Sequence, residues 1–221
     1  MINRILRKIE KRTRSLIGKD FLDLSGDRFI EWSWVFSELP KGKASILDIG
    51  PGSEFLCSAT AARNGAEVTC FDVRRFDPPF TMQGLDLVTG DLQAYDFKDK
   101  KFDAIINVSV IEHIGLGRYG DANSTDGDIK VMQKLARWLK PNGKMLFTIP
   151  VGKDAIHSPL HRVYGQQRLP SLLGKYHILK EEYWKKKNNY MWEKASRDIA
   201  LNESSSKSYY ALGLFVLEAG N

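Results

Sequence analysis

The sequence predicts an α/β protein whose mostly parallel β-sheet is covered by helices on both faces. Five short apolar segments alternate with longer segments of helical periodicity, a pattern typical of strands joined by helical crossovers. The first apolar segment ends in a turn with two glycines, which marks a strand-to-helix connection. With 221 residues, 43% of them hydrophobic, the chain is long enough for one domain with a substantial core. We expect the strands near residues 44–49, 67–72, 86–90, 103–109 and 144–149.

The second half of the chain should add one helix and two more strands. The helix Ile129–Leu139 should end at the turn Lys140–Lys144, before the fifth strand. Tyr209–Leu217 reads as a strand, and Tyr176–Trp184 reads as another, although charges interrupt it. Residues 185–207 are polar, and we expect them to form a surface excursion without chemistry of its own.

The segment Ser45–Glu54 is the most informative about function, because it combines an apolar strand, an acid and a glycine turn that leads into a helix. Gly50 and Gly52 lack Cβ atoms where the backbone must turn sharply and a ligand can approach closely. A nicotinamide or flavin site would need a third glycine where Phe55 stands, so that a pyrophosphate could pack against the helix. Asp48 would repel a pyrophosphate and attract an ammonium group, which favours a cofactor with an amino-acid tail and no phosphate.

With this turn the chain resembles the class I S-adenosylmethionine-dependent methyltransferases, whose first motif reads acid-x-Gly-x-Gly. The resemblance implies a doubly wound, Rossmann-like sheet of seven strands, mostly parallel with an antiparallel last strand, and S-adenosylmethionine as cofactor. It places the methionine end of the cofactor at Asp48, Gly50 and Gly52. Where many members have a third glycine this chain has Glu54, whose side chain either faces solvent or narrows the methionine end.

The resemblance continues at the next two strand ends. It implies that Asp72 grips both ribose hydroxyls and that Asp91, followed by Leu92, pairs with the adenine amino group. Ligands of open α/β sheets bind outside the carboxyl ends of the strands, so Asp48, Asp72 and Asp91 should converge on one crevice. The alternative is that an acid at a strand end only caps the next helix, and this alternative is strongest for Asp91.

A helix should begin at Asp27 and stop near Pro40. In related methyltransferases the segment before the first strand often folds over the cofactor. We therefore expect residues 1–40 to form a helical extension or lid, and residues 41–221 to form the methyltransferase domain. Trp32 and Trp34 cannot share one helix face, so one should face the core while the other is free to meet a ligand, with core packing of both as the safer assumption.

A base is expected just beyond the fourth strand. Methyl transfer from a sulfonium is an in-line displacement, so the protein must hold the acceptor and, for a hydroxyl, remove a proton. Glu112 and His113 stand at this place. An imidazole with its ordinary pKa of about 6.5 suits proton abstraction near neutrality, while Glu112 would orient it or contact the acceptor. The alternative, that His113 is only part of the adenosine-pocket wall, stays open.

A glycine-rich stretch follows at residues 114–121, and it predicts a tight loop that carries Arg118 and Tyr119 toward a substrate. Asp128 is expected to be the N-cap of the helix that follows. Asp121, Asp126 and Asp128 could instead collect a divalent cation, but hard-metal sites need convergent geometry, and we predict no metal.

After the fifth strand, residues 150–165 form a second distinctive stretch. Together with the glycine-rich loop it resembles a little-characterised branch of methyltransferase-like proteins, often associated with bacterial polysaccharide synthesis, over about residues 27–217. His161, Arg162 and Tyr164 are then candidates for binding a polar acceptor such as a sugar or a phosphorylated sugar. The plain alternative is that they are surface polar residues at the start of a helix.

The formal charge of +6 is concentrated at the N-terminus. Residues 1–20 contain seven basic and two acidic side chains, so they account for +5 of it. Their apolar residues recur at helical spacing, which predicts an amphipathic helix with a cationic face. It should pack on the core or on a second subunit, as in a homodimer. The alternatives are peripheral docking to an anionic membrane surface and contact with an acidic partner.

Composition also restricts the compartment and the partners. Cys57 and Cys70 read as small buried hydrophobes in a reducing compartment, and the sequence has neither a zinc spacing nor a disulfide framework. No apolar run approaches the ~18 residues that would span a bilayer, so we expect a cytoplasmic protein. The nearly neutral body argues against nucleic acid, because phosphate backbones require distributed positive charge.

The sequence therefore predicts an S-adenosylmethionine-dependent methyltransferase that O-methylates a small polar molecule or a sugar or glycan precursor. The alternative is a binding or scaffold protein that keeps the fold without turnover, and Glu54 in place of a glycine leaves room for it. A nucleic-acid methyltransferase is the third hypothesis, and steep salt-dependent binding to RNA would revive it.

Overall fold

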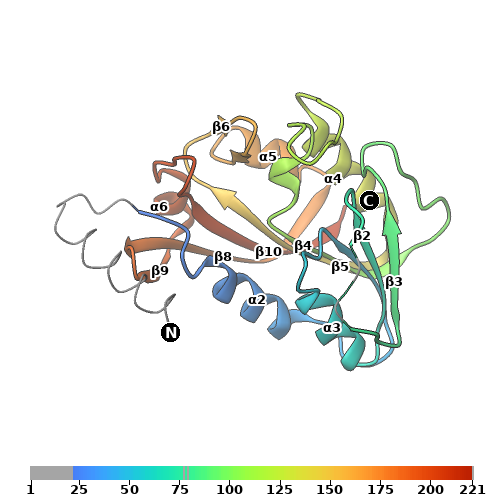
Figure 1. Ribbon diagram of the computed structural model, residues 1–221. Helices are drawn as coiled ribbons and strands as arrows, with labels where there is room; N and C mark the ends of the chain where they lie inside the picture. The colour runs from blue at the N-terminus through green and yellow to red at the C-terminus, as the bar shows by residue number, and fades with distance from the viewer. Residues whose placement is uncertain (1–21, 77, 79, 221) are drawn as a thin grey trace, which may run out of the picture.

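The computed structural model describes residues 22–76, 78 and 80–220. They form a mixed eight-stranded sheet with helices on both faces (Figure 1). The strand order is β3-β2-β1-β4-β5-β10-β8-β9, and β6 and β7 pair in a separate two-stranded sheet. The predicted amphipathic helix of residues 1–20 lies outside the described residues, and so do its predicted contacts.

Five parallel strands make up one side of the sheet, and all five were predicted. Because successive strands are joined through crossovers, their carboxyl ends lie at one edge of the sheet. The strands are β1 (Ser45–Ile49), β2 (Glu67–Asp72), β3 (Leu85–Thr89), β4 (Phe102–Val108) and β5 (Leu139–Val151).

The start of β5 differs from its prediction. The strand begins at Leu139, the last residue of the predicted helix, and runs through residues 140–144, for which the sequence indicated a turn. Phe102 of β4 pairs with Leu139, and Ala104 pairs with Lys144, so the register shifts across residues 140–143. Asn142 there has a φ of 62°, in the left-handed region. The turn signal therefore marks a bulge, and the ladder hydrogen bonds resume on both sides of it.

Antiparallel strands complete the other side of the sheet. β10 (Ala211–Ala219) pairs antiparallel with β5 and with β8 (Tyr176–Asn188), which confirms the antiparallel last strand of the predicted seven-stranded order. β9 (Met191–Ala195) pairs with β8 and adds an eighth strand at the edge.

The prediction of a surface excursion at residues 185–207 is wrong, because β8 continues into this segment and β9 and helix α6 (Arg197–Leu201) follow. Lys186 shows why a lysine-rich segment can be a strand here. Its ammonium lies 5.0 Å from the ring centre of Trp192 and donates to the carbonyl oxygen of Ser25 at 2.6 Å. The methylene groups of Lys186 are buried and its ammonium has a hydrogen-bond acceptor. This lysine can therefore lie on a sheet face that other residues cover.

Two helical layers cover the sheet, and Figure 1 shows α2 and α3 on one side of it and α4 and α5 on the other. Side chains alternate along β1 accordingly: Ile46 belongs to the apolar cluster under α2 and α3, while Leu47 belongs to the cluster under α4 and α5. The remaining elements are α2 (Asp27–Glu38), α3 (Leu56–Arg63), the 3₁₀ turn η1 (Ile111–His113), α4 (Gly127–Trp138), β6 (Ala155–His157), β7 (His161–Val163) and α5 (Arg168–Leu173).

Helix α2 begins at the predicted residue and is fastened to the sheet by a buried carboxylate. Glu31 is fully buried and accepts hydrogen bonds from the hydroxyls of Ser109, at 2.5 Å, and Thr148, at 2.6 Å. Arg28 supplies the counter-charge, with its guanidinium 2.5 Å from the same carboxylate. This network joins α2 to the ends of β4 and β5, where ligands of such sheets bind. In the part of the chain that the structure describes, none of the helices has the length and apolarity needed to cross a membrane.

Candidate active site

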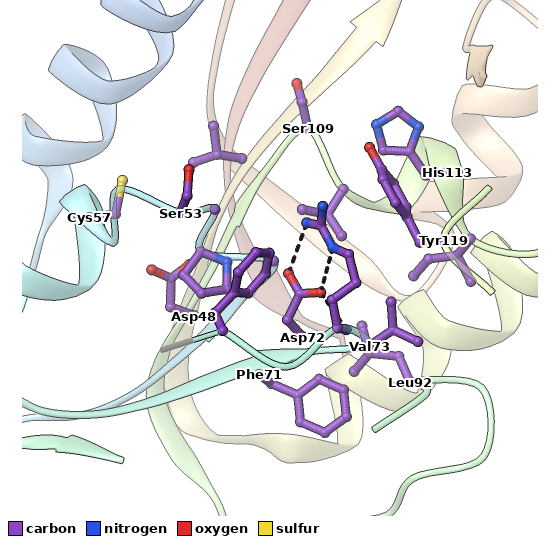
Figure 2. A pocket seen from close by; sticks show the side chains of 18 of the residues that line it. Asp48, Ser53, Cys57, Phe71, Asp72, Val73, Leu92, Ser109, His113 and Tyr119 are labelled. Atoms are coloured by element: carbon purple, nitrogen blue, oxygen red, sulfur yellow. Dashed lines mark hydrogen bonds and ion pairs between the residues drawn. The ribbon is translucent and has the colours of Figure 1, made fainter. Parts of the chain in front are cut away.

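One cleft of about 330 Å³ opens at the carboxyl ends of the parallel strands (Figure 2). Asp48 enters it from β1, Asp72 from the end of β2, and Asp91 from the segment after β3. Gly50, Gly52 and Leu92 line it as well. The three acids therefore meet in one crevice, as the order of the strands predicted, and the cleft is within the size range of small-ligand pockets.

The glycine turn after β1 forms the floor of the cleft. Gly50 has a φ of 59° and Gly52 a φ of 71°, both in the left-handed region. A Cβ atom on Gly50 would lie 2.5 Å from Cγ2 of Val110, and one on Gly52 would lie 3.3 Å from the carboxylate of Glu54. Both the backbone conformation and the close approach at Gly50 therefore require glycine.

Glu54 does not close the cleft. It is exposed, lies in the cleft wall, and accepts a hydrogen bond from the Ser53 hydroxyl at 2.9 Å. Of the two expected positions for this side chain, the structure shows the solvent-facing one. Helix α3 begins at Leu56, slightly later than expected, because Phe55 adopts a left-handed φ of 48° and packs its ring against Phe76.

Asp48 is a buried carboxyl group with one strong partner. Its Oδ2 accepts a hydrogen bond of 2.5 Å from Ser58 on α3, and only 2% of the residue is exposed. Burial raises the pKa of Asp48 to about 7, although the Ser58 hydrogen bond lowers it in part. A cationic group placed in the cleft beside Asp48 would favour its ionised form.

Asp72 and Asp91 are positioned by backbone amides. Asp72 accepts a hydrogen bond from the Arg74 amide at 2.9 Å, and the dashed lines in Figure 2 mark its ion pair with the Arg74 side chain. Asp91 accepts hydrogen bonds from the amides of Gln93, at 2.8 Å, and Ala122, at 3.3 Å. Because residues 90–101 contain no helix, Asp91 is not a helix cap. It links the segment after β3 to the glycine-rich loop.

His113 lines the cleft beside Tyr119, whose ring centre is 5.5 Å from its own (Figure 2). Its Nδ1 lies 2.5 Å from the carbonyl oxygen of Leu160, which can only accept, so Nδ1 carries the hydrogen and Nε2 carries the lone pair. Burial lowers the pKa of His113 to about 3, against the raising effect of the Leu160 hydrogen bond. The imidazole is therefore neutral near pH 7.

Glu112 lies behind His113 and is fully buried. Its Oε1 is 3.6 Å from His113 Nε2, and neither carboxylate oxygen has a hydrogen-bond partner. Burial raises the pKa of Glu112 to about 8, so near neutrality the residue is mostly protonated. An unsatisfied acid this deep in a protein is uncommon and typically has a functional reason.

The glycine-rich loop is tightly held next to the cleft. Asp121 accepts hydrogen bonds from the amides of Gly115, at 2.7 Å, and Tyr119, at 3.4 Å. Arg118 is exposed, and its guanidinium donates to the Leu160 carbonyl at 3.0 Å, beside His113. The loop therefore brings Tyr119 into the cleft wall, whereas Arg118 does not line the cleft.

The prediction that Asp128 is a helix N-cap is wrong. Helix α4 begins at Gly127, the N-cap position belongs to Asp126, and no side chain caps the helix. Asp128 instead points inward, is fully buried, and accepts hydrogen bonds from Tyr164, at 2.8 Å, and Arg168, at 2.6 Å. The helix starts earlier than expected, which turns Asp128 from the cap into the core-facing side of the first turn.

Arg162 and Tyr164, both predicted to bind substrate, do not line the cleft. Arg162 is 1% exposed and donates to the carbonyl oxygens of Ile114, at 2.5 Å, and Ser124, at 3.1 Å. These carbonyls lie near the two ends of the glycine-rich loop, so the Arg162 guanidinium holds the two ends close together. The contacts favour a positioning role for both residues, and direct contact with an acceptor stays a prediction.

His161 is buried in a small aromatic group. Its ring centre lies 5.2 Å from that of His157 and 5.1 Å from that of Tyr210, and its Nε2 has no hydrogen-bond partner. Within the described ranges, no three His, Cys, Asp or Glu side chains group as a metal site would.

Several large side chains of the cleft were not among the predicted site residues. Arg28 and Trp32 come from α2, and Arg74 follows β2. Trp32 faces the cleft while Trp34 is buried, as the two-residue spacing allowed. No sequence pattern indicated that Arg28 and Arg74 line the cleft, because isolated arginines are usually exposed surface residues.

The sequence comparisons identify a family. Residues 81–215 match the family described as "Caenorhabditis protein of unknown function, DUF268". The chain belongs to this family. The match covers Glu112, His113 and the glycine-rich loop of this DUF268 chain but leaves out the glycine turn after β1. A comparison with curated proteins finds no match.

Solved structures show the fold that this DUF268 chain shares. A 1,6-didemethyltoxoflavin-N1-methyltransferase from Burkholderia thailandensis, with 1,6-didemethyltoxoflavin and S-adenosylhomocysteine bound, is 14% identical with a TM-score of 0.59, covering 100% of this chain and 88% of that one. The N-methyltransferase NodS from Bradyrhizobium japonicum WM9, in complex with S-adenosylhomocysteine, is 14% identical with a TM-score of 0.56, covering 91% and 90%. The [4+2]-cyclase SpnF is 19% identical with a TM-score of 0.51, covering 69% and 58%. At such identities the likeness establishes the Rossmann-like methyltransferase fold alone.

Proposed function

We propose that this DUF268 chain is an S-adenosylmethionine-dependent methyltransferase. The observation that carries the proposal is the convergence of Asp48 and Asp72 on one cleft above a turn that only glycine can form. Two similar folds were solved with S-adenosylhomocysteine bound, which supports the same cofactor class.

The donor set of the cleft fits this cofactor. Asp72 presents a carboxylate for the two ribose hydroxyls, and Asp91 with Leu92 forms the far end for adenine. Burial raises the pKa of Asp48 to about 7, and the ammonium of a methionine tail beside it would favour the ionised carboxylate. A pyrophosphate cofactor would find acids where it needs donors.

The bound cofactor would supply a methyl group already activated as a sulfonium. The protein's part is to place the acceptor and accept its proton. His113 is neutral, lines the cleft, and has its Nδ1 committed to Leu160, so Nε2 is the nitrogen that can take a proton. Glu112 lies 3.6 Å from Nε2, and in its ionised form it would stabilise the imidazolium. This pair supports transfer to a hydroxyl.

The acceptor is proposed to be a small polar molecule or a sugar or glycan precursor, with Arg118 and Tyr119 in contact with it. Arg118 does not line the cleft, but its exposed guanidinium lies next to His113 and has no ion pair within the described ranges, which suits hydroxyl or phosphate oxygens of an acceptor. The association with polysaccharide synthesis, the cytoplasmic location, the lid role of residues 1–40 and the homodimer stay predictions.

Calorimetric titration with S-adenosylhomocysteine tests the proposal. The wild-type protein should bind one equivalent, whereas ATP and NADH should not bind, because both would bring phosphates to the acids of the cleft. Asp72→Ala should weaken the binding of S-adenosylhomocysteine at least about tenfold, since it removes hydrogen bonds to a charged group.

Asp86→Ala is the matched control, because Asp86 is an exposed acid on β3 that does not line this cleft. It should leave the affinity unchanged. A well-folded wild-type protein that does not bind S-adenosylhomocysteine would overturn the proposed function.

A protein that keeps the binding site without methyl transfer is the second candidate. The low pKa of His113, about 3, makes the isolated imidazole a weak base, and the related SpnF fold is described as a [4+2]-cyclase. Binding of S-adenosylhomocysteine together with no transfer of labelled methyl groups to any cellular small molecule would favour this candidate.

A further inference from the structure

Arg74 occupies the nucleoside end of the cleft. It follows the strand-end Asp72 by two residues, lines the cleft, and its side chain is 44% exposed. The chain turns back at this point because the Arg74 amide donates to Asp72 at 2.9 Å. The same turn places the guanidinium beside the carboxylate of Asp72, where part of it stays exposed to solvent.

The guanidinium of Arg74 makes contacts on both sides of the cleft. Its Nε lies 3.2 Å from Oδ1 of Asp72 and its Nη2 lies 3.3 Å from Oδ2, so both carboxylate oxygens are engaged. Its Cζ lies 4.6 Å from the ring centre of Phe76, in the segment after β2, and 4.5 Å from that of Tyr119, in the glycine-rich loop. These are cation–π distances. Arg74 thus connects two segments of the cleft wall that are distant in sequence.

We propose that Arg74 is a latch that closes the nucleoside site and must leave Asp72 before the cofactor can bind. The inference rests on the proposed function, because it takes Asp72 as the ribose ligand. Ribose hydroxyls need the same carboxylate oxygens that the guanidinium covers, and the two groups cannot occupy that space together. The protein therefore has a latched state and an open state, and only the open state binds the cofactor.

Movement of Arg74 away from Asp72 would also change the contacts of Tyr119, next to His113. Tyr119 contacts Arg74 on one side and His113 on the other, with a ring-centre distance of 5.5 Å to the histidine. When Arg74 leaves, Tyr119 loses a cation–π partner next to the position proposed for the acceptor. Cofactor binding would thus remove one of the two arginines that contact the Tyr119 ring, while Arg118, 5.0 Å from the ring centre, would stay.

The test compares two adjacent arginines. Arg74→Ala removes the latch, whereas Arg75→Ala removes a neighbouring exposed arginine that does not line the cleft. Calorimetric titration with S-adenosylhomocysteine should give an affinity about tenfold tighter for Arg74→Ala than for wild type, and an unchanged affinity for Arg75→Ala. A tenfold change means that the open state makes up about one-tenth of the wild-type protein.

A conservative variant separates the latch from a general effect of charge. Arg74→Lys keeps the positive charge but loses the bidentate ion pair with Asp72 and the planar contact with the rings. Its affinity for S-adenosylhomocysteine should therefore lie between those of wild type and Arg74→Ala. The association rate constant, measured by stopped-flow fluorescence, should rise in the same order. Unchanged thermal unfolding temperatures would show that all three variants are folded.

The outcomes separate the latch from the proposed function. Tighter binding by Arg74→Ala alone supports the latch. Equal binding by Arg74→Ala, while wild type and Arg75→Ala bind, overturns the latch. Weaker binding by Arg74→Ala also overturns it and makes Arg74 a ligand-binding residue. No binding by any of the folded proteins overturns the proposed function, and the latch with it.

Discussion

Replacing Glu112 with Gln should raise the free energy of unfolding relative to wild type, and the gain should depend on pH. We expect the gain at pH 8 to exceed that at pH 5 by about 3 kcal/mol. Burial raises the pKa of Glu112 from 4.5 to about 8 in the folded protein. As the pH rises above 4.5, the unfolded chain loses this proton while the folded protein keeps it. The folded state therefore loses stability progressively until about pH 8, where it releases the proton too.

Urea unfolding at several pH values between 5 and 8 measures this difference. The glutamine of the variant does not titrate, so the difference in free energy of unfolding between variant and wild type isolates the one carboxyl group from all others. Glu67→Gln is the matched control, because Glu67 is exposed at the start of β2 and lacks the burial that surrounds Glu112. A Glu112→Gln difference that is constant from pH 5 to pH 8 would show that Glu112 titrates normally.

The stability that the protein loses by burying Glu112 is explained by the proposed function. A buried acid without hydrogen-bond partners weakens the fold at the pH where the protein works, and glutamine would fill the same volume at lower cost. The proposed function gives the reason for keeping it, since an acid beside Nε2 of His113 can ionise and stabilise an imidazolium. Sites that break the usual rules of stability are commonly functional.

Asp128→Ala should destabilise the protein by about 3–5 kcal/mol, the usual cost of removing one partner from a buried charge pair. Asp128 is fully buried, bonds to Arg168 at 2.6 Å and lies 3.8 Å from the buried Nε of Arg162. The variant would leave Arg162 without its carboxylate, and Arg162 is the residue that holds the ends of the glycine-rich loop. Urea unfolding gives the stability, and hydrogen exchange at residues 114–125 reports on the loop.

Asp126→Ala is the matched control. Asp126 also lies near Arg168, at 3.5 Å, but its side chain is 56% exposed, so its loss should cost no more than about 1 kcal/mol. The loop should become more exchangeable in Asp128→Ala alone. If both variants lose the same small amount of stability, Asp128 is not the centre of this network.

The parallel strands and the acid-lined cleft were predictable because simple rules connect them to the sequence. Strand-length apolar segments joined by crossovers give a parallel sheet, and the carboxyl ends of such strands meet at one edge. The prediction of a helix in every crossover is wrong, because the described residues between β2 and β3 and between β3 and β4 contain none. An acid that ends a strand, such as Asp48 or Asp72, is therefore placed by topology alone. No knowledge of its side-chain partners is needed.

The residues that were misplaced depend on partners far away in the sequence. A polar residue at the start of a helix can point outward as a cap or inward to a partner, and periodicity does not distinguish the two. Asp128 turned inward because Tyr164 and Arg168, 36 and 40 residues later, offer donors there. Lys186 was read as surface because its covering partners, Trp192 and the carbonyl of Ser25, come from separate segments.

A crystal structure of the protein with S-adenosylhomocysteine tests the central claim most directly. We expect the ribose hydroxyls within hydrogen-bond distance of Asp72, the amino-acid tail over Gly50 and Gly52 beside Asp48, and the sulfur facing His113. Arg74 should have turned away from Asp72. A nucleoside bound outside this cleft, with Asp48 and Asp72 making no contact to it, would contradict the account.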